Sequence, residues 1–199
     1  VSGTGVSTNY TLTQPTVTGT ISKAPLGITV SGTYSGSTTL SAPTFTVTGL
    51  VNSETITSLT SATLNSKDVA NNSTNYVTAI AINVGSATAS NYQISQAYNA
   101  SAGTTQNTVT LSKATLTVTG TTAPSKTYDG TTTATIAGGT LVGALGSDSI
   151  TLTQAGTYSS ANAGSGISIT MNDSVSGTGV STNYTLTQPT VTGTISKAP

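Results

Sequence analysis

Short runs in which apolar and hydroxyl side chains alternate recur along the chain. Residues 115–119 read T-L-T-V-T, residues 149–153 read S-I-T-L-T, and residues 167–171 read I-S-I-T-M. Alternation at period two, with many β-branched residues, is typical of half-buried β-strands. Stretches rich in glycine, asparagine and serine, such as residues 159–166, separate the runs and favour turns. No segment has the period of an amphipathic helix, and the pattern predicts an all-β protein.

The inward-facing positions of these strands define a predicted hydrophobic core. Leucine, valine and isoleucine are expected to point inward, and serine and threonine outward. In the second half of the chain, the predicted core residues are Leu116, Val118, Ile136, Ile150, Leu152, Ile167, Ile169 and Leu186. Disordered chains combine few β-branched residues with a high net charge. This chain has neither property, so a folded core is expected.

Composition excludes several classes of partner. The 199 residues include five lysines and five acidic residues, and no arginine, histidine, cysteine or tryptophan. A net charge of zero offers no attraction to nucleic acid or anionic lipid. No apolar stretch approaches the roughly 20 residues of a membrane-spanning helix, and the first residues do not resemble a secretory signal. We expect an internal fragment of a longer chain, with no nucleic-acid partner and no membrane span.

The same composition argues against catalysis and bound cofactors. Without histidine or cysteine, the chain lacks the commonest general base, thiolate nucleophiles and the usual zinc ligands. A calcium site needs several converging oxygen ligands. The acidic residues are dispersed along the chain, at Glu54, Asp68, Asp129, Asp148 and Asp173. We expect no enzymatic activity, no cofactor and no metal site.

Repeats divide the chain into modules. The first 25 residues recur without a change at residues 175–199. A shorter sequence, S-K-A, occurs three times, and its lysines are Lys23, Lys113 and Lys197. The spacings of 90 and 84 residues between these lysines correspond to two related, diverged modules.

Three regions follow from these repeats. Residues 25–113 are expected to form a diverged repeat, and residues 114–199 a second repeat. Residues 1–24 are interpreted as the C-terminal strands of a preceding, incomplete repeat. Because an isolated hairpin is marginal in water, we expect residues 1–24 to be ordered by packing on a neighbouring copy of the chain or on an exposed sheet edge. The alternative is that these residues complete an earlier repeat of a longer molecule, of which this sequence is a part.

Each module has a length and turn spacing that favour a β-sandwich. Six to eight short strands in about 85 residues predict an immunoglobulin-like antiparallel sandwich. A β-solenoid would need self-similarity at roughly 20 to 30 residues, and a small α+β fold would need a helix of about 10 residues. Neither is visible. The lysine junctions are short, so we expect tandem modules arranged end to end as a stiff rod.

One sequence motif resembles a known family. The stretch K-T-Y-D-G-T-T-T-A-T at residues 126–135 is followed by G-S-D-S-I-T-L-T and a closing N-Y-T-L-T-Q-P. These motifs, in this order, closely resemble the YDG-type modules of very large secreted bacterial adhesins. Such filamentous-haemagglutinin-like proteins also carry related MBG-type modules in long arrays. Residues 39–41 read T-L-S where the first repeat is expected to carry Y-D-G, so that repeat is interpreted as a diverged sister.

Tyr128, Asp129 and Gly130 are predicted to have a structural role. Aspartate bonds local backbone amides, glycine supplies a positive φ, and the tyrosine ring is expected to be buried with its hydroxyl in water. Related surface modules sometimes cross-link a buried lysine to an asparagine with the help of an acid. Lys126 is the candidate lysine and Asp148 the candidate assisting acid. The alternative is that Lys126 is a solvated lysine.

Two classes of function remain. The resemblance implies a protein of the bacterial cell surface or exterior, in which these repeats form a stalk that extends an adhesive region from the cell. The alternative is a recognition module for a glycan or a host protein, with ice binding by the threonine array as a further variant. Exposed aromatic residues are few, and the twist of sandwich sheets disfavours a flat array. The stalk is favoured, with neighbouring repeats of the same chain as its partners.

Overall fold

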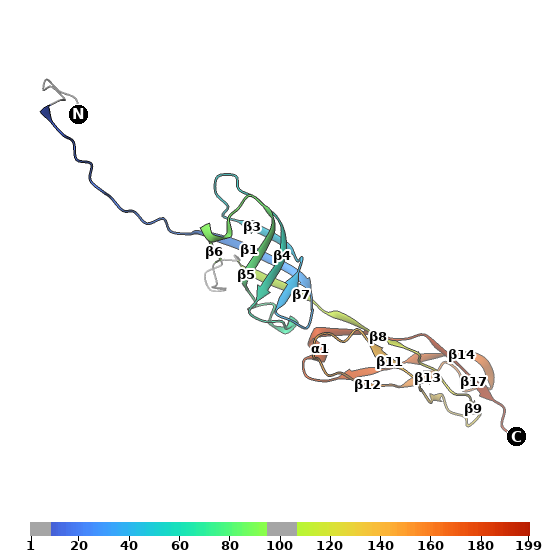
Figure 1. Ribbon diagram of the computed structural model, residues 1–199. Helices are drawn as coiled ribbons and strands as arrows, with labels where there is room; N and C mark the ends of the chain where they lie inside the picture. Colours follow the sequence, from blue (N-terminus) through green and yellow to red (C-terminus); the bar gives the residue numbers. More distant parts are fainter. Residues whose placement is uncertain (1–8, 95–106) are drawn as a thin grey trace.

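The strands of the protein fall into two groups that are joined at Lys113 (Figure 1). A computed structural model describes residues 9–94 and 107–199. Residues 24–112 are referred to as the N-terminal body, and residues 114–196 as the C-terminal body. No helix in the described residues is long and apolar enough to cross a membrane. The all-β fold expected from the alternating pattern is confirmed.

Two sheets build the N-terminal body. Its elements are β1 (Ala24–Thr33), β2 (Thr39–Ser41), β3 (Thr44–Thr48), β4 (Ile56–Leu64), β5 (Val77–Gly85), β6 (Tyr92–Ile94), β7 (Thr108–Ser112) and the 3-10 turns η2 (Val69–Asn71) and η3 (Ala89–Asn91). Strands β3, β6 and β7 pair with β1, while β2, β4 and β5 form a second sheet. Apolar residues of both sheets, including Ile28 and Leu59, form one core. The alternation therefore buries one face of each sheet.

The C-terminal body contains more and shorter strands. Its elements are β8 (Ala114–Thr119), β9 (Lys126–Thr127), β10 (Thr133–Ala134), β11 (Thr140–Val142), β12 (Thr151–Thr153), β13 (Gly156–Tyr158), β14 (Gly164–Met171), β15 (Ser174–Ser176), α1 (Val180–Asn183), β16 (Tyr184–Thr187) and β17 (Val191–Ser196). They form three sheets, ordered β10-β13-β14-β17-β9, β11-β8-β16 and β12-β15. Its apolar residues form two clusters, and one of them includes Tyr34 of the N-terminal body.

Parallel strand pairs distinguish these sheets from the antiparallel sandwich expected from the sequence. Strand β1 runs parallel to both β6 and β7. In the C-terminal body, β8 runs parallel to β16 and β9 runs parallel to β17. A parallel pair requires a long crossover between its strands, and here most of each body separates the early strand from the late one. In the described residues, the sheets that contain β1, β8 and β9 are therefore mixed, whereas β2-β4-β5 and β12-β15 are antiparallel. The immunoglobulin-like class itself stays a prediction.

The predicted core residues of the C-terminal body lie at two depths. Leu116, Val118 and Ile169 are buried. The other five are half-buried: Ile136, Ile150, Leu152, Ile167 and Leu186. The alternation itself holds, because the threonines that flank Leu116 and Leu152 are exposed. Ile136 and Ile150 lie outside the strands, and Leu152 lies in the two-stranded sheet of β12 and β15, so fewer neighbouring strands cover these three side chains.

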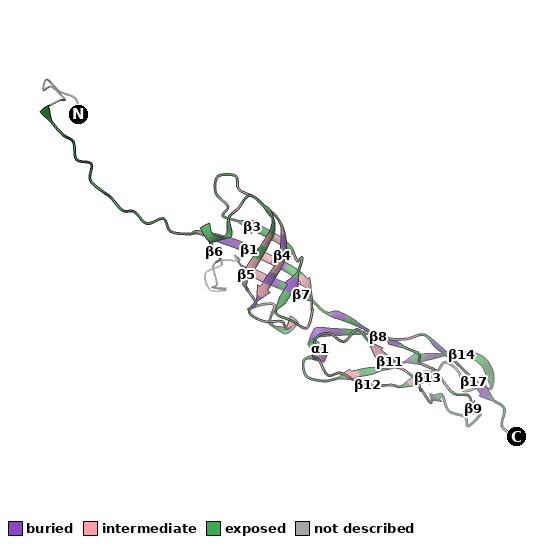
Figure 2. Cartoon of the chain, in the orientation of Figure 1, coloured by how far each residue is buried: buried purple, intermediate pink, exposed green. Residues whose placement is uncertain are grey.

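Residues 9–23 precede β1 and contain no β-strand. They are exposed along their whole length (Figure 2), and Ile21 is 100% exposed. The strands expected for this sequence form only in its second copy, as β16 and β17. There they have β8, β14 and β9 as partners, whereas residues 9–23 pair with no strand among the described residues. Ordering of residues 1–24 by a neighbouring chain stays a prediction, and residues 1–8 lie outside the described residues.

Candidate functional site: the junction between the two bodies

Tyr34 links the end of the N-terminal body to the C-terminal body. It directly follows β1, and its backbone N–H donates to the Ser112 carbonyl at 2.9 Å. Because β1 and β7 are parallel, with Thr33 opposite Ser112, both strands end at the same place. The Tyr34 side chain is only 2% exposed. Its hydroxyl donates to Asp148 Oδ2 at 2.6 Å, so a tyrosine at the end of β1 in one body bonds to an acid of the next body.

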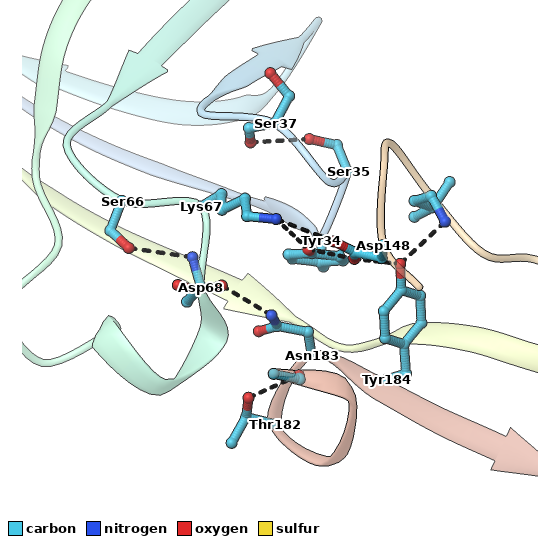
Figure 3. A network of polar contacts seen from close by, with 12 residues as sticks. Tyr34, Ser35, Ser37, Ser66, Lys67, Asp68, Asp148, Thr182, Asn183 and Tyr184 are labelled. Carbon is cyan, nitrogen blue, oxygen red and sulfur yellow. Dashed lines mark hydrogen bonds and ion pairs between the residues drawn. The ribbon is translucent and has the colours of Figure 1, made fainter. Parts of the chain in front are cut away.

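Asp148 is the centre of a polar network (Figure 3). It lies between β11 and β12, and the Tyr184 hydroxyl donates to its Oδ2 at 2.8 Å. Lys67 of the N-terminal body donates to Asp148 Oδ1 at 3.1 Å and to the Tyr34 hydroxyl at 3.0 Å. The Tyr184 hydroxyl also accepts the Leu145 N–H at 3.0 Å. Two tyrosines and a lysine therefore satisfy one carboxylate.

The network shifts the pKa values of its members so that the ionised forms of Asp148 and Lys67 are favoured. Burial opposes ionisation of Asp148, but the hydrogen bonds from Tyr34, Tyr184 and Lys67 hold the pKa of its carboxyl below the ordinary value. Burial and the bond to Asp148 raise the pKa of Tyr34, and they raise that of Tyr184 to about 12. Hydrogen bonds to Tyr34 and Asp148 raise the pKa of Lys67. The ionised carboxylate and the neutral phenols are the stable forms at neutral pH.

A second set of contacts lies beside this network. Asn183 Nδ2 donates to Asp68 Oδ1 at 2.8 Å, and the Val69 N–H donates to Asn183 Oδ1 at 2.9 Å. The linker residue Lys113 donates from its ammonium group to the Ser181 carbonyl at 2.7 Å. These bonds join the η2 turn, the linker and α1. The junction therefore has several independent attachments around a connection of one residue.

The two glycines at the junction allow the backbones to touch. Gly36 and Gly146 have φ angles of +74° and +60°. A Cβ atom built on Gly36 lies 2.9 Å from the Gly146 nitrogen, so a larger residue would push the bodies apart. The tyrosine rings of Tyr34 and Tyr184 meet edge to face, with centroids 5.2 Å apart. Close backbone approach and ring packing add shape to the polar contacts.

An open cleft of about 470 Å³ runs beside the junction. Lys67, Asp68, Asp148 and Asn183 contribute to its lining, and all four bond to one another or to neighbours within the junction. No group of three or more acidic, histidine or cysteine side chains in the described residues could hold a metal ion. The arrangement is suited to fixing the geometry between two bodies.

The Y-D-G motif forms a local turn at the far end of the C-terminal body. Asp129 Oδ1 accepts from the Thr131 N–H at 2.9 Å and pairs with Lys126 at 2.8 Å. These contacts lower the pKa of Asp129 to about 2. Gly130 has a φ of +77°. Tyr128 is 45% exposed, so its ring is less covered than the sequence led us to expect.

The structure does not bring the cross-link candidates together. Lys126 bonds to Asp129, Thr131 and Thr133, whereas Asp148 pairs with Lys67. Of the three junction lysines, Lys113 lies between the bodies and bonds to Ser181. Lys23 and Lys197 are exposed. The middle S-K-A sequence thus lies between the two described bodies.

Sequence reasoning missed Tyr34 because it placed the counterpart of Y-D-G at residues 39–41. The true counterpart is T-Y-S-G-S-T-T at residues 33–39, which matches T-Y-D-G-T-T-T at residues 127–133. The structure supports this alignment. The Tyr128 N–H donates to the Ser196 carbonyl at 2.8 Å, as the Tyr34 N–H does to Ser112. Both serines begin an S-K-A sequence. The repeated T-Y-x-G motif was the signal from which the equivalence of Tyr34 and Tyr128 could have been recognised.

The start of the N-terminal body has a tyrosine–acid pair that resembles the Tyr184–Asp148 pair of the junction. The Tyr92 hydroxyl donates to Glu54 and accepts the Val51 N–H at 3.1 Å. Tyr92 lies opposite Ala24, the first residue of β1. Tyr184 lies opposite Ala114, the first residue of β8. Glu54 and Tyr92 thus occupy the positions that Asp148 and Tyr184 occupy in the C-terminal body.

Comparison with known families agrees with this division of the chain. Residues 28–104 match the MBG domain of YGX type, and residues 112–192 match the YDG domain. The chain joins an MBG domain to a YDG domain. The MBG match lies within the N-terminal body, and the YDG match covers most of the C-terminal body. Tyr34 belongs to the MBG domain, and its partner Asp148 to the YDG domain.

MBG and YDG domains occur in adhesin-like surface repeat proteins. Both domain types indicate that this chain belongs to a surface-associated protein. No curated protein and no solved structure matches the chain. The family resemblance inferred from the Y-D-G motif is confirmed at the level of the two domains.

Proposed function

We propose that this chain is a stalk segment of a bacterial surface or secreted adhesin. In this role the MBG and YDG domains add length, and the junction fixes the direction in which the second domain continues from the first. The domain types support the surface assignment. We also propose that the segment has no enzymatic activity, in keeping with a sequence without histidine or cysteine.

The observation that carries the stalk proposal is the network around Asp148. A chain that only tethered two domains would need a flexible linker, rich in glycine and serine. Here the linker is Lys113 alone, and Asp148 draws Tyr34 and Lys67 of the N-terminal body onto the C-terminal body. The Asp148 side chain is 12% exposed, so solvent screens these bonds weakly. Such a junction supports a fixed angle between the bodies.

Small-angle X-ray scattering of the full chain tests this proposal. The wild type should give an elongated particle with a single well-defined maximum dimension. Asp148→Lys places two lysines against each other in the junction, so the scattering curve should change to that of two bodies with variable orientation. Asp129→Lys makes the same change in charge at an exposed turn outside the junction, and its curve should match that of the wild type.

A compact or folded-back wild-type particle would contradict the stalk proposal. Circular dichroism of the Asp148→Lys protein should retain the β spectrum, since the substitution acts between the bodies. If Asp148→Lys scatters like the wild type, the network does not set the angle and another part of the junction must do so.

A second candidate function rests on a hydroxyl-rich face of the N-terminal body. Strand pairing places Thr46, Thr29 and Thr108 in one row, and Thr44, Ser31 and Thr110 in the next. Thr33 and Ser112 continue the array, with their hydroxyls 3.1 Å apart. Such a face could recognise a polar surface, either a glycan or ice. It favours the recognition class and is compatible with a stalk.

Binding assays separate the two candidates. A glycan array and an ice-affinity assay on the full chain should show no saturable binding if the segment is only a stalk. Saturable binding that is lost in Ser31→Lys, at the middle of the array, would instead support recognition. Thr117→Lys, on an exposed position of β8 in the other body, is the matched control.

A further inference from the structure

One sequence of 15 residues has two environments in this molecule. Residues 9–23 are identical to residues 183–197. In the second copy, Tyr184 is 4%, Val191 7% and Ile195 1% exposed. Their first-copy counterparts are Tyr10, Val17 and Ile21, which are 71%, 83% and 100% exposed. The apolar face of the first copy is therefore not covered by any of the residues that the structure describes.

The buried copy closes the C-terminal body. Strand β16 pairs with β8, from Tyr184 opposite Ala114 to Thr187 opposite Thr117. Strand β17 pairs with β14 on one side and with β9 on the other. Its Val191 and Ile195 belong to the core cluster that includes Tyr158 and Met171. Any segment with the same side chains would fit this position equally well.

We propose that residues 9–23 of one chain can take the place of residues 183–197 in the C-terminal body of a second copy of the chain. The copies would then associate head to tail, because the donor segment precedes the N-terminal body and the acceptor lies in the C-terminal body. Strand donation of this kind uses main-chain hydrogen bonds for affinity and side-chain pockets for specificity.

The two ends of the molecule have the surfaces that such an arrangement brings together. In the exchanged pair, β1 of the donor chain would follow the closed C-terminal body, as β8 follows β7 at Lys113. The Tyr128–Gly130 turn would then face the Glu54 and Tyr92 pair. Tyr34 and Gly36 are covered at the existing junction, whereas a Cβ built on Gly130 meets nothing within 4 Å. The head-to-tail contact would repeat a junction that the protein already forms.

In the intact chain the tethered copy has the advantage. Residues 183–197 belong to the same chain as β8 and β14, which gives them an effective concentration in the millimolar range or above. Residues 9–23 of another chain compete only at their actual concentration. The wild type is therefore a monomer at micromolar concentration, and exchange becomes visible when the resident copy is weakened.

A substitution in the resident copy tests the exchange in the full chain. Ile195→Asp places a carboxylate in the core and weakens only the second copy. We expect this protein to form oligomers whose mass rises with concentration, measured by light scattering after size-exclusion chromatography. Its C-terminal body should melt cooperatively in the oligomers. The matched double substitution, Ile21→Asp with Ile195→Asp, removes both copies and should leave a monomer without that transition.

A synthetic peptide keeps the test decisive. A peptide of residues 9–25 added to the double variant should restore the melting transition of the C-terminal body, and the same peptide with Ile21→Asp should not. The proposal is overturned if the Ile195→Asp protein stays monomeric and lacks the transition at tens of micromolar, or if the unmodified peptide fails to restore it.

Discussion

Two equivalent tyrosines of this protein differ in how far they are buried. Tyr34 and Tyr128 both follow a strand that is parallel to the last strand of their body, and both donate their backbone N–H to the serine of an S-K-A sequence. Tyr34 is buried against Asp148, while Tyr128 is 45% exposed. The motif is a turn in both bodies, and it becomes a junction where a second body follows.

Removing the hydroxyl of each tyrosine should therefore have different effects. Tyr34→Phe loses a hydrogen bond to an ionised carboxylate, which should lower the free energy of unfolding by about 1.5 to 3 kcal/mol. Tyr128→Phe removes an exposed hydroxyl, and its effect should stay within about 0.5 kcal/mol. Urea denaturation of both full-length variants measures the difference. Equal losses would show that the Tyr34 bond to Asp148 contributes no net stability.

Acid should weaken the junction through Asp148. Because the folded pKa of this carboxyl lies below its ordinary value of 3.8, its ionised form stabilises the folded state above that value, and this contribution is lost as pH falls through the folded pKa. The melting temperature of the wild type should exceed that of Asp148→Asn at pH 7. The difference between the two should begin to shrink below about pH 4, as the pH falls toward the folded pKa. A difference that does not shrink in acid would assign the effect to something other than ionisation.

Alkaline pH acts on the same network with the opposite sign. The phenols of Tyr34 and Tyr184 have raised pKa values, about 12 for Tyr184. Their neutral forms stabilise the folded state below pH 10, and this stability is lost as pH rises through the folded values. The junction is thus most stable between about pH 4 and pH 10.

Sequence patterns could identify these residues only in part. The repeated T-Y-x-G-x-T-T motif marks Tyr34 and Tyr128 as equivalent, and the local bonds of Asp129 were expected from its type. The partnership of Tyr34 with Asp148 spans 114 residues. It depends on which ends of the two bodies meet, and a single sequence contains no direct signal for that.

At the level of elements, the neighbouring strands control how deeply an inward residue is buried. Leu116 lies in the six-residue strand β8 between β11 and β16, and it is fully buried. Leu152 lies in the three-residue strand β12, which pairs only with β15, and it is half-buried. Alternation predicts the direction of both side chains. It cannot predict their depth, because depth depends on the neighbouring strands.

Alanine substitutions should reflect this difference in depth. Leu116→Ala should cost about 2 to 5 kcal/mol, the range for a fully buried leucine. Leu152→Ala should cost less, since part of its surface already contacts water. Thr151→Ala, on the exposed face of the same strand, should change the free energy of unfolding by no more than about 0.5 kcal/mol. Equal losses for Thr151 and Leu152 would mean that the inward face of β12 is wrongly assigned.

The parallel strand pairs show a second limit of sequence reasoning. Short strands with glycine-rich turns are typical of antiparallel sheets, and most pairs here are antiparallel. The exceptions join the early strands of each body to its last strands, as β1 joins β7. The order in which distant strands meet is determined by packing over the whole body, so period-two alternation carries no information about it.

At the scale of the whole molecule, the duplicated segment allows an internally controlled measurement. Residues 9–23 and 183–197 have the same sequence, and hence almost the same intrinsic rates of amide hydrogen exchange. In the wild-type monomer, the amides of β16 and β17 should exchange at least roughly a thousandfold more slowly than those of residues 9–23, which corresponds to about 4 kcal/mol of local stability. Peptides that include the different flanking residues distinguish the copies in mass spectrometry. Similar protection of both copies would show that residues 9–23 are paired in solution.

The parallel pairing of the first and last strands of the N-terminal body has a mechanical consequence. Tension along the proposed stalk would pull this body at the start of β1 and at the end of β7. Five residue pairs join these strands, from Thr29 opposite Thr108 to Thr33 opposite Ser112. In a parallel pair the load acts along the strands and on all of their hydrogen bonds together, whereas a hairpin pulled at its open end separates one bond at a time. The N-terminal body would therefore resist force in shear, as the proposed stalk function requires.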